Sequence, residues 1–405
     1  MKENIKSNLF TEKKIVKTAI IIAEYNPFHN GHAYQLDAIR TLGYDRIVSI
    51  MSGNFVQRGS PAITDKAFRT QAALSCGVDL VVELPLPYAM ATADRFAFGG
   101  VSLANAFADA NATLFFGSES NKITDLKKIV SLLRSASVDA EIKEHLISGK
   151  SYAQARQLAI LHAGGNARLL QTPNDILAVE YLKHISLSGN KISASSLPRT
   201  EVDHHAVIPG NSCSSASWLR SRCLEQGLLP LRPYIPEAAY RIYLDAFSCG
   251  AMPCSMQKLD TAVIARLRSM SMADFSMLPD MSEGLPNRLY NTARTAVTLD
   301  DFISTATTNR YPSSRIRRAA MSAFLGIPAA LCRKEPPYLR LLGMNKNGVQ
   351  LLNLASRHIP VISSLTAADP DYAALEARGT DLFELCKPQP SGCGAEYRRK
   401  IIKLS

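Results

Sequence analysis

Long apolar segments are missing from this chain of 405 residues, although 46% of its residues are hydrophobic. No stretch approaches the roughly 18 consecutive apolar residues of a membrane-spanning helix, so we expect no membrane segment. Residues 1–17 are polar and basic and lack the apolar core of a secretory signal. We therefore expect a cytoplasmic protein in which residues 1–15 form a short extension before the first strand.

Closely spaced cysteine pairs are also missing. The chain contains eight cysteines, at Cys76, Cys213, Cys223, Cys249, Cys254, Cys332, Cys386 and Cys393. None forms a Cys-x-x-Cys pair, and the spacing is typical neither of a disulfide framework nor of a zinc ribbon. We expect free thiols in a reducing compartment and no protein-bound structural metal.

Acidic residues are too few to balance the basic ones, since 35 Asp and Glu face 46 Lys and Arg, a net charge of +11. Between residues 310 and 346, eight basic side chains accompany a single acidic one, Glu335, and two tyrosines. Such a run is more often a solvated helical face, but arginines beside aromatic rings also bind RNA. Together with a nucleotide site elsewhere, the run would favour RNA. The arginines that we predict to bind it are Arg310, Arg315, Arg317, Arg318 and Arg340.

The first part of the chain alternates between short apolar segments and helix-compatible segments. The predicted strands span residues 16–23, 46–51, 79–84 and 113–116. The predicted helices between them span residues 33–42, 65–75 and 95–108. Short apolar strands without polar alternation are typical of a parallel sheet with helices on both faces. Ligands bind such sheets at the carboxyl ends of the strands, so residues that directly follow a strand are candidates for a site.

The length of the chain predicts two domains, because one compact core rarely grows this large. Several helices are expected between residues 122 and 165, as an insertion before a helix over 174–184 and a strand over 191–198. After a proline-rich stretch, apolar residues recur at helical spacing. We predict an α/β domain with a Rossmann-like parallel sheet over residues 16–230 and a mainly helical, basic domain over 231–405.

A histidine pair directly follows the first predicted strand. Residues 29–32 read His-Asn-Gly-His and precede the first predicted helix. A helix N-terminus presents free backbone N–H groups and a partial positive charge, which favour a phosphate group. Gly31 allows close approach of the backbone, and the imidazoles of His29 and His32 donate hydrogen bonds to phosphoryl oxygens. We interpret this turn as a nucleotide site.

Two other interpretations of the histidine pair are open. The histidines could cap a surface helix, or they could form half of a metal site. A zinc site needs further ligands, and the nearby candidates, Glu24 and Asp37, lie at no familiar spacing. The position between a strand and a helix therefore favours the nucleotide site.

A second helix start supplies groups that a departing pyrophosphate needs. Residues 214–220 read Ser-Ser-Ala-Ser-Trp-Leu-Arg, and serines are favoured caps of helix N-termini. Arg220 lies about one turn into this helix and carries a guanidinium that suits phosphate. An ordinary serine-capped helix with a surface arginine is the alternative. The histidine pair elsewhere favours a role for Ser215, Ser217 and Arg220 in ATP binding.

These motifs resemble the H-x-G-H nucleotidyltransferase superfamily and, within it, the bacterial tRNA(Met) cytidine acetate ligase family. The resemblance is carried by residues 24–32 (EYNPFHNGH), 52–59 (SGNFVQRG), 79–85 (DLVVELP), 116–119 (FGSE) and 173–177 (PNDIL). Residues 310–318 and 338–343 are more loosely similar. The resemblance covers most of the chain from about residue 16 on and implies a nucleotidyltransferase-like catalytic domain followed by a tRNA-binding part.

The family resemblance also implies a reaction and a set of residues. ATP and acetate would give acetyl-adenylate and pyrophosphate, and the acetyl group would pass to N4 of the wobble cytidine of elongator tRNA(Met). His29 and His32 would be the catalytic pair. The residues implied to hold ATP are Ile22, Glu24, Asn26, Pro27, Phe28, His29, Gly31, His32, Gln35, Gly117, Asn174 and Arg199. We add Asn54, Gln57 and Arg58 for placement of the substrate.

The implied partners are tRNA and acetate, with no membrane and no obligate protein partner. Mg²⁺ is expected to accompany ATP, bound largely through the phosphates. Two other functions stay open. A small-molecule adenylyltransferase of the same fold would explain the histidines but would leave the basic second half of the chain without a role. A non-catalytic RNA-binding protein would not need two imidazoles at this turn.

Overall fold

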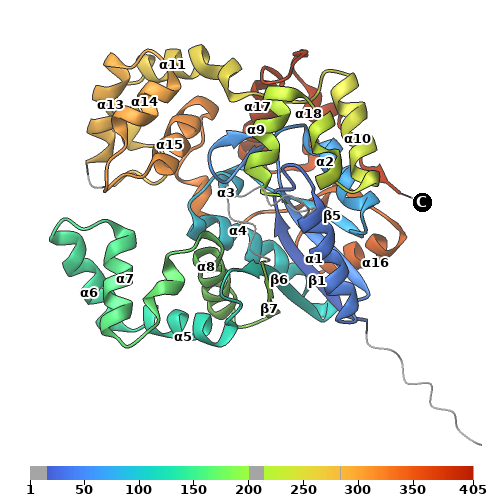
Figure 1. The fold of residues 1–405 in the computed structure, drawn as a ribbon, viewed down its shortest axis with the longest axis horizontal. Coiled ribbons are helices and arrows are strands. Elements are labelled where there is room, and N and C mark those ends of the chain that lie inside the picture. The colour runs from blue at the N-terminus through green and yellow to red at the C-terminus, as the bar shows by residue number, and fades with distance from the viewer. Residues whose placement is uncertain (1–15, 200–213, 283, 405) are drawn as a thin grey trace, which may run out of the picture.

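The computed structural model describes residues 16–199, 214–282 and 284–404. The predicted extension over residues 1–15 lies outside the described residues. In the described part, the chain folds around one mixed sheet with helices on both faces and two helical lobes that project from it (Figure 1). None of the seven cysteines that the structure describes forms a disulfide. Within the same ranges, no helix is long and apolar enough to cross a bilayer.

Five parallel strands form the centre of the sheet, in the order β5-β2-β1-β6-β7. They are β1 (Thr18–Ala23), β2 (Arg46–Ser52), β5 (Leu80–Leu84), β6 (Ala112–Ser118) and β7 (Ser193–Pro198). Ile20 of β1 pairs with Val48 on one side and with Leu114 on the other. The four strands predicted first and the strand predicted over 191–198 are therefore confirmed, with shifts of a few residues at their ends.

Side chains that alternate along β1 enter two different cores. Ile20 is fully buried in a core that also contains Val48 and Leu114, whereas Ile21 packs in the core on the opposite face. Because both faces are covered, the strand needs apolar residues at successive positions, which explains its unbroken apolar sequence.

Helices cover the two faces in separate groups. The face of Ile21 is covered by α1 (Asn30–Thr41), α2 (Lys66–Ser75), α9 (Ala216–Gln226) and α10 (Glu237–Ser248). The face of Ile20 is covered by α3 (Leu86–Ala89), α4 (Ala93–Ala104), α8 (Pro173–Leu187) and α16 (Lys346–Ala355). The chain leaves β1 towards the first group and leaves β6 towards the second. A crevice therefore opens between the carboxyl ends of β1 and β6, where such folds bind ligands.

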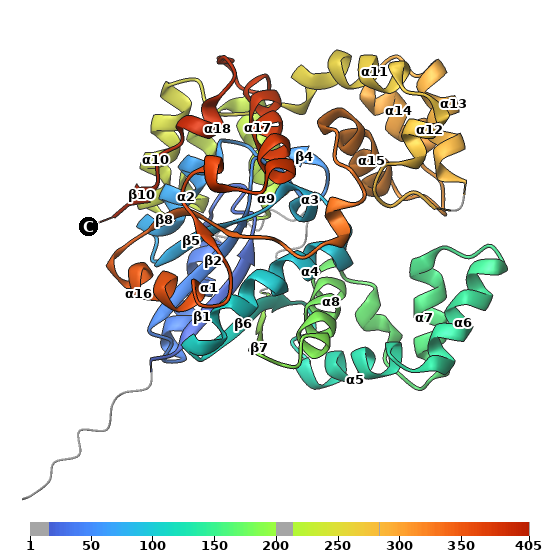
Figure 2. The same cartoon turned by 180° about the vertical axis from the view of Figure 1, so that it is seen from behind.

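The two helical lobes project from the same side of the sheet, as both views show (Figures 1 and 2). One lobe precedes α8 and contains α5 (Ile123–Leu133), α6 (Ala136–Ile147) and α7 (Tyr152–His162), which agrees with the helices predicted between residues 122 and 165. The other contains α11 (Asp260–Ser269), α12 (Met272–Ser276), α13 (Leu285–Thr295), α14 (Leu299–Ala306) and α15 (Ser313–Leu325). A small hairpin of β3 (Phe55–Val56) and β4 (Ser60–Pro61) lies between β2 and α2.

The last part of the chain returns to the sheet, which corrects the predicted division near residue 230. Strand β8 (Leu339–Met344) pairs antiparallel with β5, and β9 (Val361–Ile362) and β10 (Ile402–Lys403) pair with β8. Helices α17 (Pro370–Glu384) and α18 (Ala395–Arg398) lie between β9 and β10 in the chain. Most of residues 338–343 belong to β8, a buried strand that covers the edge of β5, while the described residues after 230 are otherwise mainly helical, as predicted.

A buried ionic network fastens this returning segment to α2 and β5. The Lys66 ammonium lies 2.5 Å from Glu83 and 2.6 Å from Glu396, and all three side chains are at most 1% exposed. Arg340 pairs with the same two carboxylates, and Arg399 binds Asp65 through two contacts, of 2.7 and 3.0 Å.

The charges of this network nearly cancel. Although burial opposes it, Lys66 and the arginines hold the pKa of Glu396 below its usual range. The pKa of a fourth acidic side chain, Glu376, shifts in the opposite direction. Burial and the nearby Glu83 raise this pKa to about 8. Three cations therefore face three carboxylates, and Glu376 is mostly protonated near neutral pH.

Arg340 was predicted to bind RNA, and the structure contradicts this. Its side chain is 3% exposed and its guanidinium lies between Glu83 and Glu396. The basic run from which it was chosen contains both a surface helix and a buried strand, and charge counting does not distinguish them.

We predict that Lys66→Ala lowers the free energy of unfolding by about 3–5 kcal/mol, because two buried carboxylates lose a compensating charge. Urea denaturation measures this loss. The control is Lys143→Ala, since Lys143 pairs with Asp139 at an exposed position and surface pairs contribute little. Equal stabilities of the two variants would contradict the proposed role of the network.

Candidate active site

A cavity of about 380 Å³ opens between the carboxyl ends of β1 and β6. The predicted residues that line it are Ile22, Glu24, Asn26, His29, Gly31, His32, Gln35, Gln57, Arg58, Gly117, Asn174, Arg199 and Ser215. These residues come from six separate parts of the sequence. The structure therefore brings together most of the predicted site, and their binding of ATP stays a prediction.

The histidine pair forms the first turn of α1. His29 is the N-cap, and its Nδ1 accepts a hydrogen bond of 3.1 Å from the Gly31 N–H. His32 Nδ1 accepts one of 3.2 Å from the His29 N–H, and the two rings stack with centroids 3.9 Å apart. Because each Nδ1 accepts from the backbone, each neutral ring carries its proton on Nε2. Both Nε2–H groups are left as hydrogen-bond donors.

The environment keeps both histidines neutral. Burial, together with the cationic Arg199 and Arg220, lowers the pKa of His29 to about 3. Burial and the neighbouring His29 lower the pKa of His32 well below its ordinary value. The pair therefore offers fixed N–H donors near neutral pH, without adding charge of its own.

Three further helices begin at the cavity wall. Ser215 caps α9 by accepting from the Trp218 N–H at 3.2 Å, and Ala216 lines the cavity. Helix α8 begins beside it with Pro173, and α4 begins with Ala93. Each helix N-terminus contributes partial positive charge, so with α1 four of them favour an anion in this space.

Helix α8 begins at Pro173, one residue before the predicted start, and its N-cap, Thr172, makes no side-chain capping hydrogen bond. The carboxylate of Glu119, which follows β6, instead accepts from the backbone N–H groups of Asn174 and Asp175 at 3.2 and 2.9 Å. The Asn174 side chain in turn accepts from Arg199 at 2.8 Å. Glu119 thus fixes the groups that present Arg199 to the cavity, a role that no local sequence pattern indicates.

Arginines approach the cavity from several directions. Arg199 crosses the end of β6, where a side chain at Gly117 would meet it at 2.9 Å. Arg220 lies behind the cavity wall and donates to the Asn26 carbonyl at 2.8 Å. Arg58 is exposed at the rim, at the tip of the β3–β4 hairpin. Together with the helix N-termini, Arg199 and Arg58 make the cavity suited to a polyphosphate.

Arg69 positions the loops of the site and was missed by the sequence analysis. Its fully buried guanidinium donates to the carbonyls of Glu24, Ser52, Gly53 and Thr64. These carbonyls lie after β1, at and just after the end of β2, and in the segment between β4 and α2. Arg69 lies within an ordinary helical pattern, so only its three-dimensional contacts show this role.

Several predicted residues do not face the cavity. Asn54 is 5% exposed, accepts from the Lys66 N–H and donates to Thr380, so its predicted role in substrate placement is wrong. Phe28 is fully buried, and its N–H donates to the Tyr243 hydroxyl. Pro27 lies beside it in the buried turn, and Ser217 is exposed beyond Ser215 on α9.

The remaining arginines of the basic run lie on and before α15. Arg315 and Arg318 are about 15% and 14% exposed and pair with Asp280. Arg310 and Arg317 are half-buried. Their predicted binding of RNA is not tested by the geometry and stays a prediction.

Two clusters in the described part of the chain have the spacing of metal ligands, and neither lies in the cavity. They are Glu141, His145 and His162 between α6 and α7, and Asp94, Glu180 and His184 near the start of α4. Lys183 already pairs with Asp94 and Glu180 in the second cluster. The prediction that no structural metal is bound therefore stays open.

The sheet order, the histidine turn and the anion-binding cavity together define a nucleotidyltransferase. The model of the HIGH Nucleotidyl Transferase family matches residues 16–396. A tRNA(Met) cytidine acetate ligase of a Thermoanaerobacter species is 34% identical over 95% of this chain and 99% of its own length. The enzyme of that name from Acetivibrio thermocellus is 34% identical over 96% of this chain and its full length.

A solved structure agrees with these relatives. The crystal structure of Thermotoga maritima TmcAL bound with alpha-thio ATP is 29% identical, with a TM-score of 0.87 over 96% of this chain and all of that one. The chain belongs to the tRNA(Met) cytidine acetate ligase family.

The low pKa of His29 predicts a pH dependence of stability. Below about pH 6.5 the unfolded chain binds a proton on this side chain that the folded chain does not, so stability falls as the pH decreases. His29→Asn keeps a side-chain acceptor for the helix cap but removes the imidazole that binds this proton in the unfolded chain. We expect the variant to lose less stability than the unchanged protein between pH 7 and pH 5 in urea denaturation. The control is His358→Asn, at a surface pair with Asp109; equal losses in the unchanged protein and His29→Asn would contradict the prediction.

Proposed function

We propose that this protein activates acetate with ATP and transfers the acetyl group to N4 of the wobble cytidine of elongator tRNA(Met), forming N4-acetylcytidine. The observation that carries the proposal is the pair of Nε2–H donors on neutral histidines at the carboxyl end of β1. Full-length similarity to tRNA(Met) cytidine acetate ligases supports the choice of substrates.

ATP would meet both apolar and polar parts of the cavity lining. Phe96, Leu177 and Tyr181 supply apolar surface, which suits the adenine ring. His29, His32, the helix N-termini and Arg199 suit the phosphates. Mg²⁺ accompanying ATP would be held mainly by phosphate oxygens.

In the first step a carboxylate oxygen of acetate attacks the α-phosphorus of ATP. The bond to the bridging oxygen breaks, and pyrophosphate leaves with that electron pair. Negative charge grows on the departing group and on the oxygens around the α-phosphorus. The Nε2–H donors and the helix N-termini are already oriented towards this space, so they stabilise the charge without reorganisation. Because each imidazole carries its proton on Nε2, the pair acts as donors and not as a general base.

In the second step the N4 amine of cytidine attacks the acetyl carbonyl, and AMP leaves. A mixed anhydride hydrolyses readily, so water must be excluded while it waits for RNA. The β3–β4 hairpin, which carries Arg58 at its tip, packs closely on α15, because a side chain at Gly59 would meet the Arg318 backbone nitrogen at 2.9 Å. Through this contact, RNA bound on the α11–α15 lobe would lie near the rim of the cavity and help to close it.

The test of this function measures acetate-dependent release of pyrophosphate from ATP, with and without bulk bacterial tRNA, followed by nucleoside analysis of that tRNA. Acetate-dependent turnover with N4-acetylcytidine in the tRNA would support the proposal. Turnover without acetate, or the absence of acetylated cytidine, would favour a small-molecule adenylyltransferase.

We predict that His32→Ala lowers kcat for acetate-dependent pyrophosphate release by about 10²–10³, as expected for loss of one oriented donor. Binding of tRNA should change little, because His32 lies inside the cavity. Steady-state kinetics and filter binding measure the two effects. Pyrophosphate release at the unchanged rate would remove His32 from the mechanism.

We predict that Arg317→Ala weakens tRNA binding and leaves ATP binding unchanged. Loss of one phosphate contact should reduce the slope of log K against log salt by about 0.7–0.9. Filter binding over a range of salt concentrations measures the slope. An unchanged slope and affinity at low salt would place the RNA surface elsewhere.

A further inference from the structure

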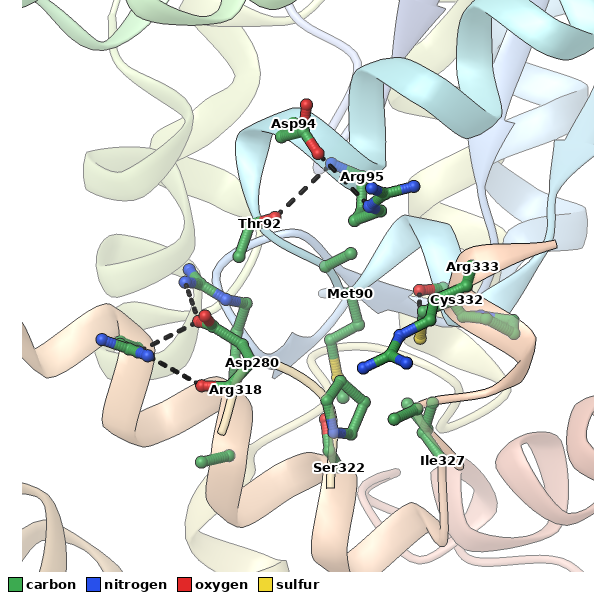
Figure 3. Close-up of a pocket in the computed structure, with 16 residues that line it drawn as sticks. Met90, Thr92, Asp94, Arg95, Asp280, Arg318, Ser322, Ile327, Cys332 and Arg333 are labelled. Carbon is green, nitrogen blue, oxygen red and sulfur yellow. Dashed lines mark hydrogen bonds and ion pairs between the residues drawn. The ribbon is translucent and has the colours of Figure 1, made fainter. Parts of the chain in front are cut away.

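A second cavity, of about 210 Å³, lies beside the ATP cavity and has no part in the chemistry described above (Figure 3). It opens between the start of α4, the α15 helix and the segment that follows α15. One short stretch of chain separates the two cavities, because Ala91 and Thr92 line the second cavity while Ala93 lines the first. Gln57, which lines the ATP cavity, donates to the Ala91 carbonyl at 3.2 Å across this wall. A ligand in the second cavity would thus be separated from the ATP cavity by this short segment.

The second cavity carries an excess of positive charge. Four guanidinium groups line it, those of Arg95, Arg315, Arg318 and Arg333, against the carboxylates of Asp94 and Asp280. The Arg333 side chain is exposed and forms no hydrogen bond or ion pair within the described ranges. Figure 3 shows Arg318 and Asp280 on one side of the cavity and Arg333 on the other. An anionic group between them would be bound from two sides.

Asp280 holds two of these arginines in place. Its carboxylate lies 3.1 Å from Arg315 and 3.7 Å from Arg318, and its carbonyl accepts from Arg315 at 2.8 Å. Asp280 has a φ of 61°, a left-handed conformation that residues other than glycine adopt rarely and at some cost. The 3.7 Å contact exceeds hydrogen-bond length, so Arg318 keeps donors for a ligand.

The rest of the lining is apolar. Met90 and Ile327 are 3% and 2% exposed, and Ala319 and Cys332 are also buried. Burial raises the pKa of the Cys332 thiol to about 11, so it behaves as a small apolar group. A simple inorganic anion would leave this surface without a partner. A planar ring that carries a phosphate would use both parts of the cavity.

We propose that this cavity binds one unstacked nucleotide of the RNA substrate, adjacent to the cytidine that enters the ATP cavity. The base packs against Met90 and Ile327, and its phosphate is bound by Arg318 and Arg333. Single-stranded loops are recognised in this way, with bases turned outward into pockets. The inference rests on the proposed function, and it adds a subsite that selects the nucleotide beside the acceptor.

The first experiment reverses one positive charge of the subsite at an exposed position, where the fold should not be disturbed. Arg333→Glu changes an exposed residue, and Arg241→Glu is a control with the same charge change on α10, where Arg241 is 76% exposed. We expect Arg333→Glu to weaken binding of the tRNA(Met) anticodon stem-loop at least about tenfold more than the control, with ATP binding unchanged in both. Equal weakening of RNA binding by the two variants would mean that only the net charge of the protein matters. That result would overturn the proposed nucleotide subsite.

The second experiment asks whether a base occupies the cavity. Ala329 lies half-buried at the rim, so Ala329→Trp fills the space while the surrounding core stays intact. Stem-loops with an abasic site on either side of the wobble position are compared with the intact RNA. We expect one abasic RNA to bind the unchanged protein more weakly, and Ala329→Trp to bind that RNA and the intact RNA equally. An abasic penalty that persists in Ala329→Trp would overturn the proposal.

Failure of this inference can be told from failure of the proposed function. If the unchanged protein forms no N4-acetylcytidine on any tRNA, the function is wrong whatever the variants do. If it forms N4-acetylcytidine and Ala329→Trp does so with the same kcat/KM for tRNA, the function stands and the nucleotide subsite is wrong.

Discussion

The site depends on one buried guanidinium. Arg69 donates to the carbonyls of four residues that lie after β1, at the end of β2 and just before α2, and none of its surface reaches solvent. Carbonyls at strand ends have no partners in the sheet, and leaving them buried without donors would be unfavourable. A single planar group with five N–H donors satisfies several at once. The backbone just before the turn that carries His29 is therefore held in place by Arg69. The His29 imidazole can then cap α1, and the His29 N–H can orient the ring of His32.

The electrostatics of the cavity follow from dipoles and arginines, and the histidines add directed donors. Four helix N-termini and Arg199 make the potential in the cavity more positive, which suits an anion. Burial, and after it Arg199 and Arg220, keeps the His29 imidazole from binding a second proton by lowering its pKa. Burying a neutral histidine costs less free energy than burying a charged one. Its fixed tautomer leaves the Nε2–H as a donor at the cavity. Burial and nearby positive charge together thus set the protonation state of the histidine pair.

Patterns of neighbouring residues in the sequence predicted those features of the structure that interactions between neighbouring residues determine. The strands follow from apolar runs, and the histidine turn and Gly117 follow from their places directly after strands. The family resemblance added Asn174 and Arg199, and the structure brings these site residues to one cavity. The errors arose where distant partners decide the outcome. Arg340 is buried because Glu83 and Glu396 lie across from it, and Asn54 faces inward because Lys66 and Thr380 bind its amide. Arg69 and Glu119 act on backbone groups of other elements. No spacing along the sequence reports such contacts.

Helix α2 connects the two halves of the chain. Lys66 and Arg69 lie about one turn apart on it; Lys66 binds the carboxylates that hold β8 and α18, whereas Arg69 binds the loops of the site. The segment that follows the α11–α15 lobe is therefore fastened to the same helix that orients the cavity. Because buried charges tolerate little displacement without loss of their partners, β8, α18 and the site are held in one arrangement, and the β3–β4 hairpin packs against α15 of the lobe. An RNA loop bound by α15 would meet a cavity whose position relative to that helix is already set.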